Sequence, residues 1–137
     1  MVEKNGFREF DHTADWGIQV WARDIFGLLE TAARGMFSLL EVQKGEGNRS
    51  EFNFSLVKHQ DKEDLLVEFL SELLFLSEQN QVAFDGFKFE TEGDHHHITA
   101  RSYPIVGQNK EIKAVTYYGL SVDHSENGLE TKIVFDV

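Results

Sequence analysis

Cysteine is absent from this 137-residue chain, and proline occurs only once. The absence of cysteine excludes disulfides, thiolate metal ligands and a cysteine nucleophile, and it agrees with a cytoplasmic protein. Long apolar runs are missing too, because no segment approaches the roughly 20 residues that a membrane-spanning helix needs. No apolar leader opens the chain either. We therefore expect a soluble, unexported protein that does not associate with membranes.

Positive charge is also scarce. Thirteen Lys and Arg stand against 24 Asp and Glu, which gives a formal net charge of −11, and the cations are scattered along the sequence. A field of this sign repels phosphate backbones, so direct tight binding of nucleic acid is not expected. A link to nucleic acid would more readily run through a basic partner protein. An equally simple interpretation is that the charge keeps a small domain soluble.

The residues that are present suit one domain with a packed core. Hydrophobic residues make up 41% of the chain, and twelve of them are Phe. A chain of this length can bury one core but not two comfortable ones. The sequence contains no repeat, linker or low-complexity tract. We therefore predict a single domain over residues 1–137.

Two segments have the spacing of amphipathic helices. Apolar side chains recur on one helical face over residues 25–40, and Asp24 precedes them as an N-cap. The second helix should begin at Asp61, with Asp64 three residues later in an approximate capping box, and its apolar stripe runs to Ser77. Acidic side chains cover the rest of its surface: Glu63, Glu68, Glu72 and Glu78.

Strand patterns account for most of the remaining chain. Segments at residues 7–10, 17–22, 51–57, 82–90, 97–104, 112–124 and 129–137 are predicted strands, with turns at residues 92–94 and 126–128. Within the segment 112–124, Tyr117 and Tyr118 should point to opposite faces, one into the core and one to solvent. Strands at both ends with helices between them predict an α+β fold, with mostly antiparallel sheets and two main helices.

Polar groups gather near both ends of the chain. Asp11, His12 and Asp15 belong to the segment DHTAD at residues 11–15, and Asp136 precedes the terminal carboxylate of Val137. If the terminal strands are neighbours, these carboxylates collect at one place, and hard oxygen ligands suit Ca²⁺ or Mg²⁺. The alternative for DHTAD is an ordinary turn, because Asp and Thr side chains commonly bond to nearby backbone groups.

Other candidate residues have simpler explanations. Lys113 begins a predicted strand, where a lysine is usually a solvated guard of a sheet edge. Of the three consecutive histidines, only His95 and His97 could converge, since His96 points to the other face of a strand. No acidic or histidine partner can be placed beside them, so we assign them no metal site. The sequence has no P-loop, dinucleotide-binding glycine pattern or nucleophile–base set, and an enzyme acting alone is not expected.

The opening segment resembles a known family motif. Residues 10–17, FDHTADWG, resemble the "EHTADIG" opening of the archease family, and residues 113–117, KAVTY, look like its "KAITYH". The helices at 28–40 and 64–76 and the apolar residue after a C-terminal aspartate agree with the family in order, so the resemblance covers nearly the whole chain. Three positions differ from the usual pattern of the family. Trp16 stands where a small aliphatic residue is usual, and Tyr118 stands where His is frequent. Asp11 takes the place of the common Glu.

The resemblance implies an accessory protein of tRNA splicing and RNA repair rather than an enzyme. Archeases act on the RtcB-type RNA ligase, assist its guanylylation and multiple turnover, and broaden the nucleotides it can use. By this resemblance the metal ligands are Asp15, Asp136 and Val137, with Ca²⁺ expected and Mg²⁺ or Mn²⁺ as alternatives. Lys113 matches a lysine implicated in activating the ligase. Asp11 and His12 are expected to act on the partner beside it.

The residues and the resemblance together lead to two alternative hypotheses for the function. The first is an activator that offers a carboxylate–metal site, with Lys113 nearby, to the active centre of the ligase. The second is a chaperone-like protein-interaction module whose metal ion is purely structural. A metal-dependent hydrolase is a weaker third, because only His12 could serve as a general base. The sequence leaves the oligomeric state open.

Overall fold

The computed structural model of the chain describes residues 5–12, 15–126 and 128–137, and of Asp11, His12 and Asp15 it describes the backbone only. Within these residues the elements follow in the order β1 (Gly6–His12), β2 (Asp15–Ala22), α1 (Ile25–Leu40), β3 (Val42–Lys44), β4 (Ser50–Val57), α2 (Lys62–Asn80), β5 (Val82–Glu92), β6 (His95–Gln108), β7 (Ala114–Val115), β8 (Asp123–Ser125) and β9 (Gly128–Asp136).

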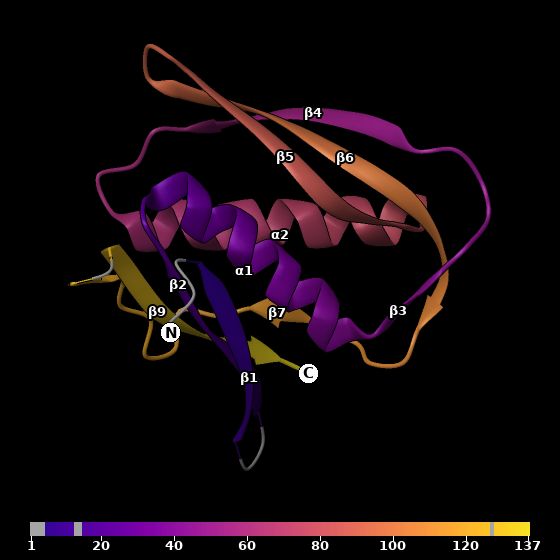
Figure 1. The fold of residues 1–137 in the computed structure, drawn as a ribbon, viewed down its shortest axis with the longest axis horizontal. Coiled ribbons are helices and arrows are strands. Elements are labelled where there is room, and N and C mark those ends of the chain that lie inside the picture. Colours follow the sequence, from indigo (N-terminus) through magenta and orange to yellow (C-terminus); the bar gives the residue numbers. More distant parts are fainter. Residues whose placement is uncertain (1–4, 13–14, 127) are drawn as a thin grey trace.

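The strands form two sheets, and both helices lie between them (Figure 1). In the first sheet the order is β1-β2-β9-β7, and β8 also pairs with β9; in the second, β6 pairs with β3, β4 and β5. These pairings are all antiparallel. Each helix contacts strands of both sheets. The protein is therefore the α+β domain with antiparallel sheets and two helices that the sequence predicts.

The helices begin and end where the sequence places them, with one difference at a cap. The Asp24 side chain accepts a hydrogen bond of 2.8 Å from the backbone N–H of Gly27, as expected of an N-cap. Asp61 holds the N-cap position of α2 but makes no side-chain cap bond. Asp64 instead accepts a bond of 3.0 Å from the Tyr117 hydroxyl. Neither helix in the described residues is long and apolar enough to cross a membrane.

The core joins the helices to the second sheet through phenylalanines. Phe69 on α2 is fully buried, and its ring centroid lies 5.5 to 6.2 Å from those of Phe54, Phe87 and Phe89. Edge-on and tilted ring pairs of this kind stabilise more than their buried area alone. This cluster fixes the inner face of α2, so the opposite face of the helix is left toward solvent.

The largest difference from the sequence prediction lies after residue 112. The predicted strand over residues 112–124 is reduced to the two residues of β7, and a loop separates it from β8. At the break, the Thr116 hydroxyl donates to the Val134 carbonyl at 2.8 Å and accepts from the Tyr118 backbone N–H at 3.3 Å. Tyr117 and Tyr118 are both exposed, at 54% and 74%. The prediction that one of them is buried is therefore wrong.

Smaller differences concern strand ends. β6 continues past Pro104 to Gln108, and the short strand β3 pairs with this extension, which the sequence does not predict. β1 and β2 extend into the DHTAD segment as far as His12 and Asp15. The predicted turn at 92–94 is confirmed by the pairing of Glu92 with His95. The predicted turn at 126–128 includes Asn127, which lies outside the described residues.

Candidate functional site

The first and last strands of the chain are neighbours, as the sequence predicts. β2 pairs with β9, with Trp16 opposite Phe135 and Gly17 opposite Val134. Continuing this register by one residue brings the backbone of Asp15 opposite that of Asp136, with the Cα atoms of such pairs about 4.5–5.5 Å apart. The two polar ends of the sequence thus meet at one end of the paired strands β2 and β9, although the carboxylate of Asp15 itself lies outside the described residues.

Lys113 reaches Asp136 from the other side of β9. Its backbone N–H donates to the Asp136 carbonyl oxygen at 2.7 Å, and Ala114 then pairs with Asp136 in the sheet. Both side chains are exposed, whereas Val137 is half-buried against the core. The backbones of two residues that are 23 positions apart in the sequence therefore meet at one end of the sheet, and both residues are exposed there.

Asp11 and His12 are placed by their backbone alone. At the end of β1, His12 pairs with Asp15 and Asp11 pairs with Trp16. They therefore belong to the strand next to the one that carries Asp15. Their side chains are not among the parts that the structure describes, so their expected role stays a prediction.

A cluster of Trp16, Lys110 and Glu41 borders this end of the sheet, and no sequence pattern predicts it. The Lys110 ammonium lies 4.5 Å from the centroid of the Trp16 ring and 3.0 Å from a Glu41 carboxylate oxygen. The hydrogen bond from Lys110 lowers the pKa of Glu41 below its usual value. Backbone N–H groups of Asn109 and Lys110 also donate to the Glu41 and Leu40 carbonyls, at 3.3 and 3.1 Å. The loop before β7 is thereby fixed to the end of α1.

The described residues contain no alternative metal centre. Among them, no group of three or more Asp, Glu and His side chains is arranged to hold a metal ion. The predicted ligand set includes the Asp15 side chain, which lies outside the described residues, so it is not among these groups. The set at Asp15, Asp136 and Val137 stays a prediction, consistent with the backbone register.

The three histidines follow the predicted alternation. His95 and His97 face outward, and His96 is buried, with its Nδ1 at 2.9 Å from the Thr91 hydroxyl. The expectation that no acidic partner lies nearby is wrong, because His95 and His97 lie 2.7 and 3.5 Å from the carboxylates of Asp94 and Glu92. Asp94 directly precedes His95 in the sequence, and the β5–β6 hairpin turn brings Glu92 close to His97, so both acids could have been considered as partners from the sequence.

His96 gives the protein a pH-dependent stability near neutrality. Burial lowers the pKa of His96, and Lys58 and His59 lower it further. The unfolded chain takes up this proton near the ordinary value of about 6.5, whereas the folded chain does so only at lower pH. Between these values the unfolded state binds more protons, so stability falls as the pH falls.

We therefore expect the free energy of unfolding to decrease between pH 7.5 and 5.5, and we expect His96→Gln to reduce that slope. Urea unfolding followed by circular dichroism at each pH measures it. His97→Gln, at an exposed position of the same strand, is the matched control and should keep the wild-type slope. An unchanged slope in His96→Gln would contradict the assignment.

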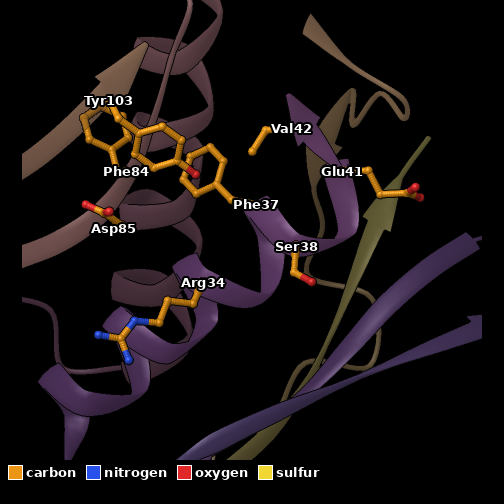
Figure 2. A pocket seen from close by; sticks show the side chains of 8 residues that line it. All are labelled: Arg34, Phe37, Ser38, Glu41, Val42, Phe84, Asp85 and Tyr103. Carbon is orange, nitrogen blue, oxygen red and sulfur yellow. The ribbon is translucent and has the colours of Figure 1, made fainter. Parts of the chain in front are cut away.

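A separate pocket of about 350 Å³ lies between α1 and β5 (Figure 2). Aromatic rings of Phe37, Phe84 and Tyr103 line it together with charged side chains. These charges already have partners, since Asp85 is held by Arg49 at 2.7 Å and Glu41 by Lys110 at 3.0 Å. Neither Lys113 nor Asp136 is among its lining residues. We assign no function to this pocket.

Comparison with known proteins gives a consistent result over nearly the whole chain. The model of the Archease protein family matches residues 7–137. The chain is 32% identical to the protein archease of Methanosarcina barkeri over 144 residues, which covers 96% of this chain and 95% of that protein. It is 28% identical to the protein archease of Methanothermobacter thermautotrophicus, with 96% and 99% covered.

Solved structures show the same likeness. The crystal structure of an archease from Thermotoga maritima, described as a possible chaperone, is 25% identical and superposes with a TM-score of 0.67, covering 95% of this chain and 96% of that chain. The solution structure of protein 1598 of Methanobacterium thermoautotrophicum superposes with a TM-score of 0.73, covering 98% of this chain and all of that chain. Because the sequence identity to this second structure is 24%, the similarity shows a shared fold only.

Proposed function

The chain belongs to the archease family, and from this membership we propose that it is an accessory protein that activates an RtcB-type RNA ligase in tRNA splicing or RNA repair. In this proposal it works in the cytoplasm on a protein partner, binds no nucleic acid tightly by itself, and is not an enzyme. The observation that supports it best is the backbone hydrogen bond that joins Lys113 to Asp136 at one end of the first sheet, where both residues are exposed to a partner.

We propose that Asp15, Asp136 and the terminal carboxylate of Val137 hold a divalent cation. The register that sets the Asp15 backbone opposite Asp136 supports this set, because Val137 follows directly. All the donors are oxygens, which suit Ca²⁺, with Mg²⁺ or Mn²⁺ as alternatives, whereas zinc usually draws on His or Cys. A cation held there would supply a positive centre able to coordinate phosphate oxygens.

Lys113 is the proposed activating side chain. Its backbone is fixed by the bond to Asp136, and its ammonium group is free to extend because the residue is exposed. Such a cation can stabilise negative charge that develops when a nucleotide is transferred. Asp11 and His12, on the adjoining β1, are proposed to contact the same partner.

The proposal is tested by guanylylation of the ligase. An RtcB-type ligase from the same organism is incubated with GTP, with and without this protein at a substoichiometric ratio, and guanylylated ligase is measured over time. We expect a clear increase in the rate and in the number of turnovers. An unchanged rate would leave the second candidate, a chaperone-like module with a structural ion, which the description of the Thermotoga maritima archease favours.

Extending the C-terminus should weaken metal binding. Residues added after Val137 convert the α-carboxylate into an amide, so the site loses one charged oxygen ligand, and Ca²⁺ affinity depends on ligand charge. We expect the Kd for Ca²⁺ to rise by about tenfold or more, which corresponds to roughly 1.4 kcal/mol. Isothermal calorimetry measures it, with the same extension placed before Met1 as the control. Equal affinity of both proteins would exclude the terminal carboxylate as a ligand.

A further inference from the structure

One face of α2 is acidic, and its side chains are exposed or half-buried. Its side chains recur at spacings of three and four residues, which places them on one side of a helix. We call this set the acidic face: Asp64, Glu68, Glu72, Phe75 and Glu78. The opposite side of the helix carries buried residues, among them Phe69 and Leu73. The acidic face therefore points away from the core. Two of its acids already have partners in the chain, because Asp64 accepts a hydrogen bond from the Tyr117 hydroxyl at 3.0 Å and Glu68 lies 2.7 Å from His59 Nε2.

The charges of this face are unfavourable in the isolated protein. Asp64 and Glu68, and Glu68 and Glu72, are like-charged pairs four residues apart, which destabilise a helix. Glu78 lies near the C-terminal end of α2, where the helix dipole favours cations, and the last turn has no basic residue. Residues 63–80 contain no Lys or Arg at all. A positively charged partner would relieve each of these costs.

Exposed aromatic side chains accompany the acids. Phe75 and Tyr117 are each 54% exposed, and Tyr118 is 74% exposed. The bond from the Tyr117 hydroxyl to Asp64 places that ring at the N-terminal end of the acidic face, and Phe75 lies eleven residues further along α2. At 1.5 Å per residue, the two aromatics stand about 16 Å apart along the helix. Large exposed apolar groups rimmed by charge are typical of protein-binding surfaces.

The loop that carries the tyrosines is held in place. The backbone N–H of Val122 donates to the Glu63 carboxylate at 2.7 Å, and that of Leu120 to the Tyr117 carbonyl at 3.0 Å. Thr116 is bonded to β9 through its backbone and its hydroxyl. A fixed aromatic side chain loses little conformational freedom on binding, so it can contribute strongly to affinity.

The acidic face adjoins the proposed site at both of its ends. The tyrosine loop follows β7 directly, and Lys113 immediately precedes β7. At the other end of α2, a pocket of about 460 Å³ is lined by Glu78 and by Glu111, which lies two residues before Lys113. Lys110 lines the same pocket, so the two carboxylates share it with one cation. A partner in contact with Lys113 could therefore extend over α2.

We propose that the acidic face, with Tyr117 and Tyr118, docks on a basic surface of the RtcB-type ligase and supplies most of the affinity of the complex. The inference rests on the proposed function. An enzyme that binds RNA must carry cations where the phosphate backbone lies, and a surface of the opposite sign on this chain complements it. In this proposal one surface, on α2, binds the ligase, and a neighbouring surface, at Lys113 and Asp136, activates it.

The test separates binding from stimulation. Two independent variants are made, Glu68→Lys/Glu72→Lys and Phe75→Ala/Tyr117→Ala, and their Kd for the ligase is measured by calorimetry at low and moderate salt. We expect at least tenfold weaker binding for each, and a shallower salt dependence for the lysine variant. In the guanylylation assay, the concentration for half-maximal stimulation should rise by the same factor while the maximum stays as in the wild type. Asp136→Ala should show the reverse, a lower maximum with an unchanged Kd.

Glu90→Lys/Glu92→Lys on β5 is the control, because it makes the same change of charge on a different surface, and it should bind like the wild type. Wild-type binding by both α2 variants would overturn the inference and leave the proposed function standing. Equal weakening by the control would also overturn it, since net charge rather than the acidic face would then set the affinity. A wild-type protein that neither binds nor stimulates the ligase would refute the proposed function and the docking inference together.

Discussion

Asp136→Ala and Lys113→Ala should each lower the stimulation of ligase guanylylation by at least tenfold while the protein stays folded. Asp136 is proposed to hold the cation and Lys113 to act on the nucleotide, so each variant removes a charge that the other cannot replace. Both side chains are exposed, and neither truncation opens a cavity in the core. Their cost in stability should stay within about 1 kcal/mol, as for other surface changes, unless folding needs the metal.

The measurement compares guanylylated ligase formed per unit time after thermal melts confirm that each variant is folded. His97→Ala is the matched control, because His97 is exposed on the other sheet and has no role in the proposal. Wild-type stimulation by both folded variants would remove Lys113 and Asp136 from the mechanism. Loss of stimulation together with unfolding would favour a purely structural acidic site.

Local sequence patterns predicted most of the fold because they act over a few residues. The apolar spacing over 25–40 and the cap at Asp24 correspond to α1, and the alternation over 51–57 corresponds to β4. The Gly93 turn has a positive φ of 61°, which glycine adopts readily, and it joins β5 to β6 as predicted. In each case the signal and the structure that it specifies lie in the same short segment.

The features that were predicted wrongly or missed depend on contacts between segments that are distant in the sequence. The strand expected over 112–124 ends near Thr116, where the Thr116 hydroxyl bonds to the Val134 carbonyl, and no local pattern indicates that bond. Lys110 meets Trp16 only because its loop is attached to the end of α1. The neighbourhood of Asp15 and Asp136 was expected from their polarity and from the family resemblance, whereas the register that supports it comes from the pairing of β2 with β9.

Replacing a phenylalanine by alanine should change the free energy of unfolding strongly on the buried face of α2 and very little on its exposed face. Phe69→Ala should destabilise the protein by about 3–5 kcal/mol, because it removes a fully buried ring and leaves a cavity among Phe54, Phe87 and Phe89. The free energy of unfolding of such a domain is roughly 5–15 kcal/mol, so the Phe69→Ala variant should be close to unfolded. Urea unfolding followed by circular dichroism measures the change.

Phe75→Ala is the matched control on the same helix, and its cost should be within about 0.5 kcal/mol. Phe75 is 54% exposed, and alanine has the higher helix propensity, so the variant can even gain stability. A large loss at Phe75 would mean that this ring belongs to the fold and is not available to a partner. A negligible loss would mean that folding does not require the ring. The ring would then be available for the docking that we propose.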